Sequence, residues 1–144
     1  MANIILSFNG SDRLVSEWNS SLLDERVRFI IRSLALKFDG LRITCLIRTD
    51  KDQADIAAKA KLRGVSGPAQ KSKHLLLDPD KICRAVDFNP LMTLKAQEEW
   101  RRKIKDYCDR HLRGIFCEIR DDGTAPHVHL HVQPDKAFEV ELLS

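Results

Sequence analysis

The chain has 144 residues, of which 43% are hydrophobic and 31% charged, a balance typical of one soluble globular domain rather than a disordered chain. The formal net charge of +3 is too small to argue for a nucleic-acid or polyanion partner. The first ten residues carry no basic segment followed by a long apolar run. We therefore expect no signal peptide and no membrane insertion, and a protein made in the cytoplasm.

The predicted elements begin with a short strand over residues 2–8. Apolar residues at helical spacing, preceded by two serines and ended by an Asp-Gly pair, predict a helix over 22–38. Residues 41–48 alternate in polarity and predict a strand, whereas the alanine- and lysine-rich segment 51–63 predicts a helix. A loop is expected over 64–72, where a Gly-Pro pair breaks the pattern.

The second half of the chain predicts one long helix and three more strands. A short strand over 84–88 is expected to stop at an Asn-Pro pair, and a helix is expected over 92–112. Residues 114–120 and 126–133 flank a turn and predict a β-hairpin, and a last strand is expected near the C-terminus. The fold class is therefore α+β, with helices covering one face of a mostly antiparallel sheet.

Three histidines of the hairpin fall on alternate positions of one strand, namely His127, His129 and His131. Alternate side chains of a strand share a face, so the three imidazoles project together while Val128 and Leu130 face the core. Packing does not explain such a row, and the chemistry of histidine favours a metal or catalytic site.

The cysteines do not suggest a metal site of their own. There are four, widely spaced and with no C-x-x-C pair, whereas thiolate zinc sites usually bring paired cysteines. A domain of this size does not depend on disulfides for its stability. We expect reduced, mostly buried thiols at Cys45, Cys83, Cys108 and Cys117.

Two families with a histidine strand must be weighed. The segment HVHLHVQ nearly matches the motif of the histidine-triad nucleotide hydrolases, but the Asn and the Gly-rich, Gln-containing stretch that precede that motif are missing here. The HUH endonucleases combine a His-x-His strand with a tyrosine nucleophile on a helix. His127, His129 and Tyr107 leave that nucleic-acid nicking chemistry open as an alternative.

A third family accounts for more of the chain. The segments Ser72–His74 and Arg84–Asp87 resemble the S-x-H … A-x-D signature of the D-Ala-D-Ala carboxypeptidase, L-Ala-D-Glu endopeptidase and hedgehog superfamily. The order of elements after them, a helix and then a hairpin carrying His-x-His, is also similar. Upstream, a strand ending in Arg48 and followed by Gln53 resembles the part of the family that faces the substrate. The resemblance extends over residues 40–133.

The resemblance implies a Zn²⁺ site and a role for each matching residue. The implied zinc ligands are His74, Asp87 and His129. His127 would polarise the substrate or support a ligand. The residues implied to bind or orient the substrate are Arg48, Gln53 and Ser72. The candidates for the general base, in order of preference, are Asp122, Asp121 and Glu118.

The sequence departs from the family pattern in two places. Twelve residues separate His74 from Asp87, where the family usually has six, so the extra residues would have to loop out. The positions where the family places its general base are Pro126 and Gly123. Neither side chain can accept a proton, so the candidates for the base are the nearby carboxylates.

The resemblance implies a single zinc peptidase-like domain over residues 1–144. Residues 1–40 would form an N-terminal strand and helix, and 41–133 the metal-site core. The expected substrate is the stem peptides of bacterial peptidoglycan, cut by a monomeric, phage endolysin-like hydrolase that reaches the cell wall on lysis. A non-catalytic zinc-binding module remains a further alternative.

Overall fold

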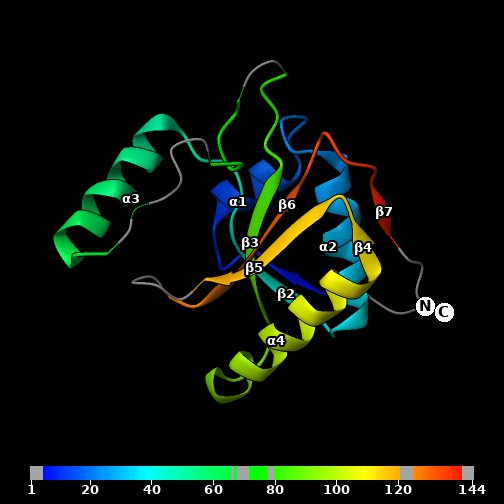
Figure 1. Ribbon diagram of the computed structural model, residues 1–144. Helices are drawn as coiled ribbons and strands as arrows, with labels where there is room; N and C mark the ends of the chain where they lie inside the picture. Colours follow the sequence, from blue (N-terminus) through cyan, green and yellow to red (C-terminus); the bar gives the residue numbers. More distant parts are fainter. Residues whose placement is uncertain (1–4, 66, 68–71, 78–79, 121–124, 141–144) are drawn as a thin grey trace.

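The computed structural model describes residues 5–65, 67, 72–77, 80–120 and 125–140. Within them the chain forms an α+β fold around a five-stranded, mostly antiparallel sheet (Figure 1). Its strands, in spatial order, are β1 (Leu6–Ser7), β2 (Leu41–Cys45), β3 (Ala85–Pro90), β6 (His127–Val132) and β5 (Ile115–Arg120). Only β1 and β2 run parallel. A second small sheet joins β4 (Leu112–Arg113) to β7 (Glu139–Val140).

Four helices occur in the described residues: α1 (Asp12–Trp18), α2 (Glu25–Lys37), α3 (Asp50–Arg63) and α4 (Leu94–His111). Helices α2 and α4 lie on one side of the sheet, whereas α3 projects away from it (Figure 1). Thr49 and Asp52 form a reciprocal capping box at the start of α3, and Gly64 ends it in the left-handed conformation with a φ of 70°. None of the described helices is both long and apolar enough to cross a membrane.

One face of the sheet supplies the hydrophobic core. Val86 and Phe88 of β3 and Leu130 of β6 are fully buried against apolar residues of α2 and α4, such as Ile31 and Ile104. Because side chains alternate along a strand, the intervening residues of β3 and β6 must project from the opposite face. That face carries the histidine row.

The predicted elements are largely confirmed, with differences at their ends. The structure adds α1, which the sequence pattern did not predict. Helix α2 begins at Glu25 rather than 22, because the Asp24 side chain accepts a hydrogen bond from the Arg26 amide and caps it. Strand β2 ends at Cys45 rather than 48. Strand β3 continues to Pro90, which is paired with Leu41, so the Asn-Pro pair does not stop it.

Candidate metal centre

The carboxylate of Asp87 is the centre of a buried polar cluster on the open face of the sheet. Asp87 is 3% exposed. One of its oxygens, Oδ1, lies 3.0 Å from His74 Nε2 and 2.9 Å from His129 Nδ1. His74 and His129 are 0% and 2% exposed. The three residues expected to bind zinc are therefore brought together at one carboxylate oxygen.

Sheet register explains two of these positions. Asp87 of β3 is directly paired with His129 of β6, so their side chains share a face. His74 comes from the loop between α3 and β3, where the Arg48 amide donates to the His74 carbonyl (2.9 Å). The Ser72 hydroxyl accepts a hydrogen bond from the His74 amide (3.3 Å). The loop thus holds His74 against the sheet by its backbone.

The hydrogen bonds of His74 show which nitrogen faces the metal position. His74 Nδ1 is 2.6 Å from the carbonyl oxygen of Leu46, which can only accept, so Nδ1 carries a hydrogen and donates it. Nε2 is left facing Asp87. Burial opposes a charge on His74, but the Asp87 carboxylate, aided by Cys45, holds the pKa of His74 well above its ordinary value.

The pKa of Asp87 shifts in the direction expected for an ion pair with His74, whereas burial dominates the pKa shifts of the other two histidines. Burial alone would raise the pKa of Asp87, but the charge of His74 and the hydrogen bonds from His129 and His74 hold that pKa well below its ordinary range. Burial lowers the pKa of His129, and lowers that of His131 to about 3. These directions favour a protonated His74 beside an ionised Asp87 when no metal is bound. A metal ion could take the place of the proton between them.

The donor set fits a divalent metal. Ligand atoms of Cys45, His74 and Asp87 lie within 4.8 Å of one another, so this buried cluster could hold a metal ion. Thiolate, imidazole and carboxylate are all zinc ligands. His129 offers a further nitrogen on the same Asp87 oxygen.

The sequence analysis missed Cys45 as a candidate ligand. Its free thiol lies opposite Asp87 because the β2–β3 register shifts between Ile43 and Cys45. Such a bulge turns a side chain to the other face and leaves no clear pattern in the sequence. Sγ of Cys45 lies 3.7 Å from His74 Nδ1, the nitrogen that already donates to a carbonyl. Cys45 therefore approaches the edge of the His74 ring that does not face Asp87.

The three residues expected to contact the substrate also lie together. The Arg48 guanidinium donates to Ser72 Oγ (3.3 Å) and Gln53 Oε1 (3.5 Å), and its Nη2 lies 3.5 Å from Asp87 Oδ2. The Arg48 side chain is 11% exposed, and its Nε is buried with no hydrogen-bond partner among the described residues. Arg48 is thus a largely buried cation next to the candidate metal site.

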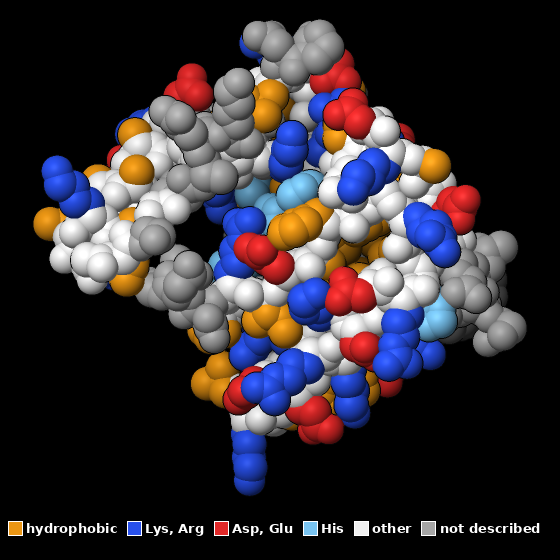
Figure 2. Space-filling model, viewed as in Figure 1, with side chains coloured by type: hydrophobic (Ala, Val, Ile, Leu, Met, Phe, Trp, Pro, Cys, Tyr) orange, Lys and Arg blue, Asp and Glu red, His pale blue; other side chains and the backbone are white. Residues whose placement is uncertain are grey.

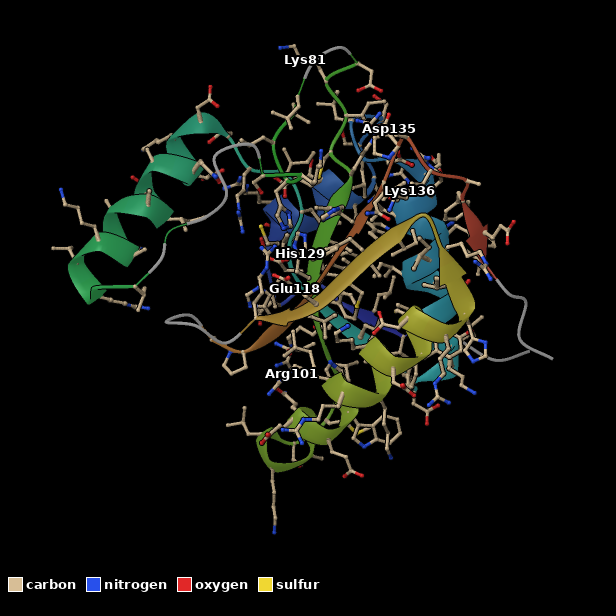
Figure 3. The ribbon with its side chains drawn as sticks, viewed as in Figure 1. Lys81, Arg101, Glu118, His129, Asp135 and Lys136 are labelled. Carbon is tan, nitrogen blue, oxygen red and sulfur yellow. The ribbon has the colours of Figure 1, made fainter. Side chains whose placement is uncertain are left out.

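His127 and Glu118 lie on the same face, nearer the surface. His127 Nδ1 donates to the Ala125 carbonyl (2.9 Å), and its Nε2 is 3.5 Å from Asp87 Oδ2. Glu118 of β5 is paired directly with His129 and forms an ion pair with Arg120. Figure 3 shows the labelled Glu118 and His129 on the two neighbouring strands. Asp121 and Asp122, the preferred candidates for the general base, lie outside the described residues.

Tyr107 does not join this cluster. It lies on α4, is 8% exposed, and packs edge-on against Phe38 at 5.7 Å between ring centroids. Tyr107 belongs to the hydrophobic core on the helix-covered face of the sheet, whereas His127 and His129 project from the other face. The arrangement does not favour a tyrosine nucleophile acting with these histidines.

Charged side chains surround the histidines that are visible on the surface. Figure 2 shows histidine side chains in a hollow near the centre of the face, with lysine and arginine side chains around it. Searches of protein-family models, curated proteins and solved structures find no match to this chain.

Proposed function

We propose that this protein is a zinc peptidase that hydrolyses peptide bonds in the stem peptides of bacterial peptidoglycan. The observation that carries the proposal is the convergence of His74 Nε2 and His129 Nδ1 on one oxygen of Asp87. A pair of imidazoles and one carboxylate is a donor set of catalytic zinc sites that leaves a position for water. The α+β fold, with this site on the face opposite the helices, supports membership of the D-Ala-D-Ala carboxypeptidase, L-Ala-D-Glu endopeptidase and hedgehog superfamily.

In this proposal His74, Asp87 and His129 hold the metal. When bound, zinc supplies a Lewis acid and lowers the pKa of a coordinated water. Cys45 is the alternative ligand to His129. Because Cys45 lies near the nitrogen of His74 that donates to Leu46, we assign the third position to His129.

The chain's own residues then move protons and hold charge. A carboxylate accepts the proton of the attacking water and passes it to the leaving amine. Glu118 is the described candidate, and Asp121 and Asp122 are the others. His127, in its protonated form, donates from Nε2 to the oxyanion that develops on the substrate carbonyl.

The cations around the site suit a substrate with free carboxylates. Arg48 presents a planar fork that matches a carboxylate, and stem peptides carry such groups on D-Glu and D-Ala. A second hollow of about 390 Å³ is lined by Lys73 and Arg84 but also by Asp80 and Asp135, and Arg84 forms an ion pair with Asp80. Lys73 precedes His74 in the chain, and Arg84 precedes Ala85, which is paired with His131. Because Arg84 is already paired with Asp80, Lys73 is the cation of this hollow suited to a carboxylate of the peptide beyond the bond to be cut.

The test is digestion of purified peptidoglycan by the zinc-loaded protein, with released amines assayed and products identified by mass spectrometry. His74→Ala and Asp87→Ala should lose zinc and reduce amine release by more than about 100-fold. His111→Ala is the matched control, because His111 lies at the end of α4 and packs on Tyr107.

Three other results would contradict the ligand assignment or favour a different function. If both variants keep full zinc, the assignment of ligands is wrong. One bound zinc with no release of amines would indicate a non-catalytic zinc-binding module. Nicking of DNA by the wild type that is lost in Tyr107→Phe, with zinc content unchanged, would favour the nucleic-acid chemistry instead.

A further inference from the structure

We propose that His131 is a positioning residue that fixes the metal-binding form of His129. The inference rests on the proposed zinc site and assigns the one histidine of the row that this site leaves without a role. His131 and His129 lie two residues apart on β6, and His129 Nε2 is 2.8 Å from His131 Nδ1. A separation of 2.8 Å between two imidazole nitrogens is typical of a hydrogen bond.

The direction of this hydrogen bond follows from the metal. A neutral imidazole that binds a cation through Nδ1 carries its hydrogen on Nε2, so His129 Nε2 must be the donor. His131 Nδ1 is then the acceptor, and the hydrogen of the His131 ring lies on its own Nε2. Histidine ligands usually donate their second N–H to an acceptor, which sets the orientation of the ring and makes it a stronger ligand. Here the acceptor is another imidazole.

His131 is placed on the far side of His129 from the metal position. His129 presents Nδ1 to Asp87 and Nε2 to His131, so the two contacts use opposite edges of one ring. His131 contacts the nitrogen of His129 that does not face Asp87. This geometry gives His131 a role through His129 and not a direct contact with the metal.

The ring of His131 is itself held in place. Phe116 of β5 is directly paired with His131 and stacks on it, with ring centroids 4.8 Å apart and ring planes 18° from parallel. Phe116 also meets the edge of the His129 ring at 6.3 Å. The stacked ring limits rotation of His131 and keeps its Nδ1 aimed at His129 Nε2 before a metal arrives, which reduces the cost of ordering the site.

Two substitutions of His131 separate the hydrogen bond from packing. His131→Asn keeps an acceptor oxygen near the position of Nδ1 but removes most of the ring. His131→Leu keeps an apolar side chain against Phe116 but offers no acceptor. The zinc dissociation constant is measured for each by competition with a chromophoric chelator, and unfolding of each metal-free protein is followed by heating. His111→Ala serves as the control for loss of a histidine elsewhere.

The positioning role predicts that His131→Leu weakens zinc binding by about 10- to 100-fold, whereas His131→Asn stays within about threefold of the wild type. The cobalt-substituted His131→Asn protein should keep the visible absorption spectrum of the wild type. If His131→Leu keeps wild-type affinity, or if His131→Asn loses as much as His131→Leu, the proposal is overturned. Because peptidoglycan plays no part in this measurement, normal zinc effects without peptidase activity would refute only the proposed function.

Discussion

Asp87→Asn is the substitution that tests the metal centre most directly. It keeps the shape of a side chain that is 3% exposed and removes the negative charge to which His74 and His129 both point. An amide is a poor zinc ligand compared with a carboxylate, so we expect zinc affinity to fall by at least about 100-fold. The loss should be visible as a change in the response of thermal stability to zinc.

The size of that response can be worked out by linkage. At a free zinc concentration 100 times the wild-type dissociation constant, binding stabilises the folded state by about 2.7 kcal/mol. A chain of this length unfolds with an entropy of about 0.3 kcal/mol per kelvin, so the wild-type Tm should rise by about 9 °C. In Asp87→Asn the same zinc concentration only equals the weakened dissociation constant. The gain is then about 0.4 kcal/mol, or about 1 °C.

Calorimetry or dye-based thermal unfolding, with zinc and with a chelator, measures both shifts. The matched control is Asp106→Asn on α4, where the carboxylate forms an exposed pair with Arg110 that contributes little to stability. Asp106→Asn should respond to zinc like the wild type. A zinc-induced shift of wild-type size in Asp87→Asn would refute the assignment of Asp87 as a ligand.

Three further predictions concern the third metal ligand, the Arg48 side chain and the Asp24 cap of α2. His129→Ala should weaken zinc binding by more than about 100-fold, whereas the zinc affinity of Cys45→Ser should stay within about threefold of the wild type. Chelator competition measures both affinities, and the reverse order would make Cys45 the third ligand. Arg48→Lys keeps a charge but loses the planar fork, so the KM for a stem peptide should rise by about tenfold or more with zinc content unchanged; an unchanged KM would remove Arg48 from substrate binding. Burial works to raise the pKa of Asp24, but hydrogen bonds from Arg26 outweigh it and the pKa lies below its ordinary value. The stabilisation is therefore present above the ordinary carboxyl pKa and lost as the pH falls through the lower folded value. Asp24→Asn, which keeps a capping acceptor, should be less stable than the wild type in urea at pH 7, and the difference should shrink as the pH falls below about 4; a difference independent of pH would show that the charge does not matter.

The parts of the fold that the sequence predicts are those encoded by local periodicity. Helix α4 shows a buried stripe that includes Ile104 and Tyr107, and the hairpin shows alternation, so both are visible without tertiary information. Helix α1 has seven residues and buries only Leu14 and Trp18, which is too little to show a period. The predicted start of α2 is too early because its capping residue, Asp24, is also held by tertiary contacts. Its amide donates to the Cys83 carbonyl at 2.9 Å.

The candidate site likewise has features that local sequence patterns predict and features that depend on tertiary structure. The pairing of Asp87 with His129 needs only two strands in register, and the shared face of the histidines follows from strand alternation. The approach of Cys45 depends on a register shift in β2, which no local pattern specifies. The link between His129 and His131 depends on how the two rings are rotated, and Phe116 on a neighbouring strand stacks on the His131 ring.

The longer gap between His74 and Asp87 does not move these residues apart, because the inserted segment folds back on itself. Leu77 pairs with Ile82 in an antiparallel bridge, which closes the extra residues into a short excursion. At its base, the Arg84 amide donates to the Lys73 carbonyl (3.1 Å), directly beside His74 in the chain. A loop whose two ends are hydrogen-bonded to each other can be lengthened without moving His74 away from Asp87. The additional residues instead form one wall of the hollow that contains Lys73 and Arg84. If the chain is the proposed peptidase, it departs from the superfamily pattern beside the proposed substrate site and not between the proposed metal ligands.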